Sequence, residues 1–180
     1  MERLSASLSM QTCDVSIPGD EEQKDKAQNQ KTQKAHHPAV FLTRERRNEL
    51  GLLFYQRLPI AIALGLQLQF DDHGDAIVTW EYSPKFGQAE NTTHGGIQAI
   101  MLESVCWFQA VSRHAREYWS TQTMTIHDLQ PARRSNLTAK AQVIKITPHT
   151  AVVEAKVYNY RGEQVSHCTA TLISRPLCKL

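Results

Sequence analysis

The sequence has no apolar run long enough to cross a membrane, and its N-terminus lacks the hydrophobic core of a secretory signal peptide. We therefore expect a cytoplasmic protein that does not bind to a membrane. An organelle presequence is the alternative for the N-terminus, but the acids Glu2 and Asp14 fit such a segment poorly.

Cysteine pairs and a strong charge of one sign are also absent. The four cysteines include no CxxC pair, and Cys106 and Cys168 lie in apolar or strand-like runs, where they fit small buried side chains. The net charge of +2 is too small to predict binding to nucleic acid.

The signatures of metal and nucleotide chemistry are missing as well. None of the histidines has the spacing of metal ligands, and the sequence contains no Walker loop, Rossmann fingerprint or Ser–His–Asp order. The sequence therefore predicts no metal and no cofactor.

Residues 1–38 contain few large apolar side chains and are rich in Gln, Lys and Asp. Such a composition buries too little surface to offset the entropy lost on ordering, so we expect a disordered tail. The rest of the chain, 39–180, is expected to form one domain. A hydrophobic fraction of 41% over the whole sequence is sufficient for a core.

The first part of this domain predicts a helix followed by a hairpin. Thr43 can cap a helix over residues 44–58, and Pro59 would end it. Apolar residues then alternate from Ile60 to Phe70 and again from Ala76 to Tyr82, which predicts two strands that bury one face.

The second part predicts a long helix followed by four strands. Apolar residues recur at helical spacing from Ile97 to Val111, with few strongly polar positions, so this helix is expected to be covered on most sides. The four strands are expected at 121–129, 137–146, 151–160 and 163–174. The order favours an α+β fold in which a curled antiparallel sheet of about six strands wraps one long central helix, with an N-terminal helix in addition.

Two glycines, Gly95 and Gly96, stand where the long helix begins. The first N–H groups of a helix have no helical partner and carry partial positive charge, and a residue without Cβ lets a carbonyl approach closely. The pair therefore fits a site that stabilises an oxyanion. Close packing of the helix against a strand explains the glycines equally well.

Glu103 is an acid within the apolar run of the same helix. It lies about 120° around the helix from the centre of the apolar stripe at Ile97, where partial desolvation would favour a base or nucleophile. A solvent-facing acid is the alternative.

The segment "HGGIQAIMLES", His94 to Ser104, resembles the hotdog-fold thioesterases, in particular the phenylacetate-pathway, aryl-CoA and 1,4-dihydroxy-2-naphthoyl-CoA types. In this family the central helix begins at HGG, an acid follows the histidine by nine positions and an amide precedes it by six. Here these positions hold Glu103 and Gln88. The segment "LQPARRSNLTAKAQV" is similar to the family's next strand.

The resemblance implies hydrolysis of an acyl-CoA or aryl-CoA thioester. The Gly95 N–H would polarise the thioester carbonyl, and Glu103 would attack it or activate water. Gln88 would orient the water or the substrate, and His94 would shape the loop. The family also implies a homodimer or homotetramer in which Gln88 and Glu103 come from opposite subunits. The residues expected at the substrate are Gly96, Asn91, Trp107, Arg133 and Arg134.

The sequence departs from the family pattern in two places. Trp107 stands where a Ser or Thr usually follows the acid, so the indole either narrows the acyl pocket or belongs to the core. The turn in "KITPHTAVV" lacks a basic-glycine pair, which leaves Arg133 and Arg134 as candidates for the CoA phosphates, with a solvated loop as the alternative. A non-catalytic acyl-CoA-binding protein and an enoyl-thioester hydratase are the competing functions.

Overall fold

The computed structural model describes residues 43–114 and 118–175. The expected tail 1–38 lies outside these residues. The helices are α1 (Arg44–Tyr55), α2 (Pro59–Leu64) and α3 (Gly95–Arg113), with 3₁₀ turns η1 (Pro84–Phe86) and η2 (Ala89–Asn91). The strands are β1 (Gln67–Phe70), β2 (Ala76–Trp80), β3 (Tyr118–Asp128), β4 (Leu137–Ile146), β5 (Thr150–Asn159) and β6 (Gln164–Arg175).

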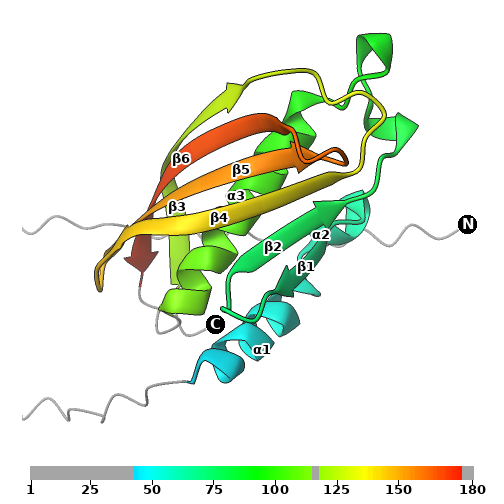
Figure 1. The fold of residues 1–180 in the computed structure, drawn as a ribbon. Coiled ribbons are helices and arrows are strands. Elements are labelled where there is room, and N and C mark those ends of the chain that lie inside the picture. Colours follow the sequence, from blue (N-terminus) through cyan, green and yellow to red (C-terminus); the bar gives the residue numbers. More distant parts are fainter. Residues whose placement is uncertain (1–42, 115–117, 176–180) are drawn as a thin grey trace, which may run out of the picture. The chain divides into compact units, whose positions relative to one another are not determined.

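The six strands form one antiparallel sheet in the order β1-β2-β4-β5-β6-β3. The sheet curls around α3, which packs against strands β2 to β6 (Figure 1). The α+β hotdog fold expected from the sequence is therefore confirmed, as are the long helix and the four strands that follow it. The order of the strands leaves β1 and β3 at the edges of the sheet.

Alternation along β5 shows why the sheet has one face on the helix. Val153, Ala155 and Val157 are buried, while Glu154 and Lys156 between them point away from the core. Side chains of a strand alternate between faces, so the apolar set of β5 meets α3 and the polar set lies on the outer face.

The core forms where α3 fills the curve of the sheet. Its largest fully buried side chains include Trp80, Trp119, Phe108, Met101 and Leu102. Within this core the sulfur atoms of Cys106 and Cys168 lie 3.7 Å apart. The contact with Cys168, together with burial, raises the pKa of the Cys106 thiol. The prediction that both cysteines are buried is confirmed.

The strand predicted from Ile60 to Phe70 is wrong over its first half. Residues Pro59–Leu64 form helix α2, and Ile60 and Ile62 are exposed rather than aligned on a buried face. Pro59 starts this helix instead of ending α1, because its fixed φ fits the first helical position. Gly65 ends it in the left-handed conformation, with φ 68°. The α1 helix does begin after Thr43, whose Oγ1 accepts the Arg46 N–H at 3.3 Å.

None of the described helices is both long and apolar enough to cross a membrane.

Candidate functional site

The N-terminus of α3 has one backbone donor without a protein partner. His94 is the N-cap, and its Nδ1 accepts the Gly96 N–H at 2.9 Å, while its carbonyl accepts the Ile97 N–H at 2.9 Å. Across the described residues the Gly95 N–H donates to no protein group. Because Nδ1 accepts, the proton of a neutral His94 ring lies on Nε2. The helix tip thus offers the Gly95 N–H to a ligand.

The two glycines serve different purposes at this tip. A Cβ on Gly96 would lie 3.0 Å from His94 Nδ1 and would disturb the cap. A Cβ on Gly95 would lie 3.0 Å from Oδ2 of Asp128, the last residue of β3. The structure therefore shows that Gly95 lies close to the end of β3, while a role in binding a ligand stays a prediction.

The helix tip opens into a cavity of about 770 Å³. Polar side chains from the loop before α3, from α3 itself and from the end of β3 line it: Gln88, Thr93, His94, Gln98, Asp128 and Gln130. Backbone bonds hold the loop in place, from Thr93 N–H to Ala132 O at 2.8 Å and from His94 N–H to Phe86 O at 3.0 Å. Gln88 and Gly95 are therefore brought together in one protomer.

Arg133 and Arg134 bond to residues in the outer part of this loop. Arg133 makes an ion pair with the Glu90 carboxylate at 3.0 Å, and Arg134 donates to Asn91 Oδ1 at 2.9 Å. Glu90 and Asn91 have φ of 63° and 58°, a left-handed conformation that asparagine adopts readily but that is uncommon for glutamate. The two arginines thus stabilise the loop that carries Gln88.

Glu103 lies apart from this tip. It lines a separate cavity of about 190 Å³ whose walls are mostly apolar: Leu58, Ile60, Ile100, Trp107 and Phe108. The partial desolvation expected for its carboxylate is wrong for the single protomer, where Glu103 is exposed. Glu103 lies beside the apolar stripe of α3. No other part of the described subunit covers this side of the helix enough to bury the acid.

Eight residues separate Gly95 from Glu103 along α3. At 1.5 Å of rise per residue, their backbones are about 12 Å apart along the helix axis. A carbonyl bound at the Gly95 N–H is therefore out of reach of the carboxylate of the same helix. The predicted site residues form two groups in one protomer, one at Gly95 and one at Glu103.

Trp107 is packed against its neighbours and borders a cavity, while its role at an acyl group stays a prediction. Its indole Nε1 donates to the Trp119 carbonyl at 2.6 Å, and its ring packs edge-on against Phe108 with centroids 4.8 Å apart. The half-buried side chain also forms a wall of the cavity beside Glu103. It is a packed residue that shapes this cavity.

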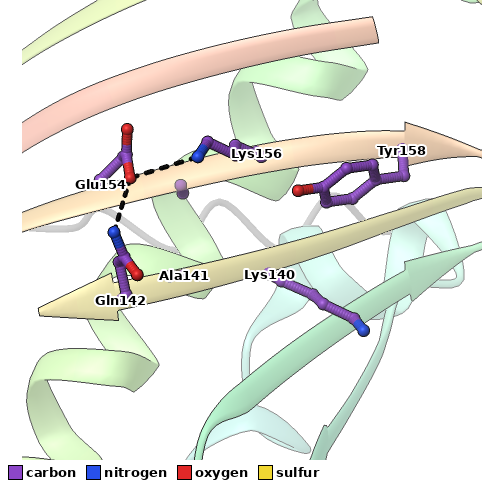
Figure 2. Close-up of a pocket in the computed structure, with 7 residues that line it drawn as sticks. Lys140, Ala141, Gln142, Glu154, Lys156 and Tyr158 are labelled. Carbon is purple, nitrogen blue, oxygen red and sulfur yellow. Dashed lines mark hydrogen bonds and ion pairs between the residues drawn. The ribbon is translucent and has the colours of Figure 1, made fainter. Parts of the chain in front are cut away.

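The outer face of the sheet carries a second polar cluster (Figure 2). The Glu154 carboxylate accepts from Gln142 at 2.8 Å, and contacts Lys156 at 3.4 Å and His167 at 3.0 Å. The hydrogen bond from His167 is the main cause that lowers the pKa of Glu154. These groups bond one another on the face of the sheet turned away from α3. Within the described residues, no three His, Cys, Asp or Glu side chains are grouped so that they could hold a metal ion.

Sequence reasoning missed several residues of the helix-tip cavity, among them Asp128, Thr93 and Gln98. Asp128 stands where a predicted strand ends, and Thr93 and Gln98 flank the HGG segment. Gln98 offered a signal, because it is a polar residue in an otherwise apolar run. Asp128 offered none, since its proximity to Gly95 depends on how β3 packs along α3.

The comparisons with known proteins agree with this geometry. Residues 90–166 match the family model described as the thioesterase superfamily, and no curated protein matched the sequence significantly. The Escherichia coli PaaI protein from the phenylacetic acid degradation operon is 22% identical, with a TM-score of 0.66, and the alignment covers 73% of this chain and 94% of that one.

Two further solved structures have the same fold. The BH2602 protein from Bacillus halodurans, solved with CoA, is 26% identical with a TM-score of 0.61, over 75% of this chain and 93% of that one. The thioesterase HI1161 from Haemophilus influenzae is 16% identical with a TM-score of 0.64, over 77% and 94%. Together they show that this chain has the hotdog fold and that its residues 90–166 are similar to the thioesterase superfamily.

Proposed function

We propose that this protein hydrolyses an acyl-CoA or aryl-CoA thioester to the free acid and CoA. The observation that carries the proposal is the Gly95 N–H, which is left without a protein partner at the tip of α3 and borders an open cavity. A helix N-terminus with a bare donor stabilises the negative charge that a thioester oxygen gains during attack.

The remaining roles follow the chemistry of the side chains. Glu103 attacks the carbonyl carbon or removes a proton from the attacking water, and both routes need its ionised form. Gln88, in the same cavity as Gly95, orients the water or the substrate. The His94 Nε2–H is a second donor close to the tip.

The catalytic acid comes from a second subunit in this proposal. Glu103 is about 12 Å along the helix from Gly95 in its own protomer, so a homodimer is the simplest arrangement that brings the two groups together. Strand β3 supports this arrangement, because its 11 residues form an edge of the sheet and its last residue, Asp128, lies at the helix tip. The apolar walls around Glu103 suit the acyl or aryl group.

The CoA phosphates are assigned to the surface of the same loop. Arg133 and Arg134 lie beside it and already bond Glu90 and Asn91, so a phosphate would compete for or extend an existing network. The structure solved with CoA, at 26% identity, supports a ligand of this type.

The decisive experiment is a panel of CoA thioesters, with aryl, short, medium and long acyl groups, assayed by detection of the released thiol. Glu103→Gln is expected to lower turnover by about a thousandfold while the melting temperature stays close to that of the native protein. The matched control is Glu49→Gln, an exposed acid on α1 that pairs with Arg46, and it should retain full turnover. Binding of CoA thioesters without any CoA release would contradict the proposal and favour a carrier.

Mixed subunits test the origin of the acid. Gln88→Ala and Glu103→Ala should each be inactive alone. If the two residues act across an interface, mixing equal amounts after subunit exchange should restore about a quarter of native activity, because half of the dimers then hold one intact site of two. Recovery of none of the activity would place both residues in a single protomer.

A further inference from the structure

Two buried polar side chains at the helix-tip cavity have oxygen atoms without hydrogen-bond partners. Thr93 is 1% exposed and Gln98 is 4% exposed, and both line the cavity. Neither Thr93 Oγ1 nor Gln98 Oε1 has a partner in the protein. Buried polar atoms are rarely left unbonded, so such a pair in one cavity points to a ligand that completes it.

A second buried glutamine on the same helix, by contrast, has all of its bonds. Gln109 is 1% exposed, and both ends of its amide are bonded: Oε1 accepts the Ala76 N–H at 2.7 Å, and Nε2 donates to Asp75 at 2.5 Å. A buried glutamine is therefore readily satisfied by this fold. At Gln98 the sheet supplies no donor.

The unbonded oxygens lie close to the group that would hold the substrate. Gln98 is three residues after Gly95, about 4.5 Å along the axis, and helical side chains lean toward the N-terminus, which brings its amide back toward Gly95. Asp128 adds a carboxylate beside Gly95, and among the described residues no cation pairs with it. Gln98 Oε1 and the Asp128 carboxylate, which accept hydrogen bonds, and the Thr93 hydroxyl, which can accept or donate, thus border this space.

We infer that Thr93, Gln98 and Asp128 form a subsite that binds a hydrogen-bond donor, a hydroxyl or an amine, carried by the acyl chain within a few bonds of the thioester. This inference rests on the proposed hydrolysis and names the class of substrate. A donor at this point bonds Gln98 Oε1 directly, whereas a plain alkyl chain leaves the oxygen buried and unbonded. A substituent that only accepts hydrogen bonds can bond the Thr93 hydroxyl but leaves Gln98 Oε1 unbonded and lies beside the Asp128 carboxylate, so it is disfavoured.

Four short CoA thioesters of equal chain length separate these cases: butyryl-CoA, 3-hydroxybutyryl-CoA, 3-aminobutyryl-CoA and acetoacetyl-CoA. The kcat/KM for the better of the hydroxy and amino compounds should exceed that for butyryl-CoA by about tenfold, and acetoacetyl-CoA should be the poorest substrate. A preference for the amine would assign the main contact to Asp128, and a preference for the hydroxyl would assign it to Gln98. Equal values for all four, or a preference for acetoacetyl-CoA, would overturn the inference.

Gln98→Leu tests the assignment to this residue. The variant should lose most of the tenfold preference, measured as the ratio of the kcat/KM values for the hydroxy or amino compound and for butyryl-CoA. Gln142→Leu, which changes a glutamine on the outer face of the sheet, is the matched control and should keep the preference. An unchanged preference in Gln98→Leu, in a protein that melts at the native temperature, would exclude Gln98 from the subsite.

Failure of the proposed hydrolysis would look different. If none of the four compounds releases CoA, the hydrolase is excluded, and titration calorimetry with butyryl-CoA and 3-hydroxybutyryl-CoA then tests the subsite alone. A dissociation constant about tenfold lower for the hydroxy compound, abolished by Gln98→Leu, would support the subsite in a binding protein. Equal dissociation constants would overturn it.

Discussion

The two ends of α3 differ in how completely their polar groups are bonded. At the C-terminal end, the Ser112 carbonyl accepts from Arg47 at 2.6 Å and the His114 carbonyl accepts from Trp119 at 2.8 Å. At the N-terminal end, the Gly95 N–H, Thr93 Oγ1 and Gln98 Oε1 have no partner in the described protein. We call the N-terminal end the open end and the C-terminal end the closed end, although the buried Nδ1 of His114 at the closed end also has no partner.

This difference shows what each end contributes. The closed end fixes the β1–β2 hairpin to the helix, because Gln109 and Arg113 both bond Asp75 in the connecting turn. Its bonds are made within the protein, so they contribute to the free energy of unfolding. The open end leaves donors and acceptors for a ligand at some cost in stability, as is common for functional sites.

Among the exchanges that compare the two ends, the largest effect is expected at the open end, from Gly95→Ala. The added methyl group would stand at the helix tip that is proposed to hold the thioester oxygen, and it would lie 3.0 Å from Asp128 Oδ2. Turnover of CoA thioesters should fall by about a hundredfold, in the range seen when an oxyanion donor is lost. Stability should change little, since Asp128 is exposed and can move. A loss of turnover matched by a large fall in melting temperature would contradict this separation of roles.

Exchanging glutamine for leucine at each end compares the two ends directly. Gln109→Leu leaves the buried Ala76 N–H unbonded and should lower the free energy of unfolding by about 2 kcal/mol. Gln98→Leu removes an atom that has no partner and should leave the free energy of unfolding unchanged or slightly higher. Urea unfolding of both variants measures the difference. Equal destabilisation would show that the open end is as closely bonded as the closed one.

Trp107 lies between the two ends of α3, and its exchange tests whether it acts in binding or only in structure. Trp107→Phe keeps an aromatic ring on Phe108 but removes the donor to the Trp119 carbonyl, which should lower the free energy of unfolding by about 1 kcal/mol. If the indole also shapes the acyl cavity, the ranking of substrates by chain length should shift toward longer chains. An unchanged ranking would show that Trp107 has a structural role only.

Periodicity was enough to predict most of the fold, because long elements repeat their signal many times. The helix from Gly95 to Arg113 and the strands β3 to β6 each present a buried and a solvent-facing pattern over 10 residues or more. Helix α2 shows the limit of the method. In six residues, an alternation of Ile and Ala fits a strand and a short helix equally well. Pro59 can either end the preceding helix or start a new one, and in the structure it starts α2.

The site was predictable only where its residues are neighbours in the sequence. The HGG segment places Gly95 at the helix tip through local geometry alone, since the cap and the free N–H both follow from it. Asp128 reaches the same point through the packing of β3 along α3, which no local pattern records. The exposure of Glu103 likewise depends on which surfaces cover the helix, and the acid keeps its proposed role only if a second subunit provides that cover.

The smallest effects are expected from the arginines at the two ends. Arg133 pairs with Glu90 beside the open end, and Arg113 pairs with Asp75 at the closed end. Both ion pairs are exposed enough that each is expected to contribute about 0.5 kcal/mol to stability. Arg113→Ala should therefore lower the melting temperature slightly and leave turnover unchanged. Arg133→Ala should leave the melting temperature nearly unchanged and raise KM about threefold, because the loop that holds Gln88 is loosened and a phosphate contact is lost. If KM rises in both variants, the two ends of α3 are coupled, and the division between a binding end and a structural end does not hold.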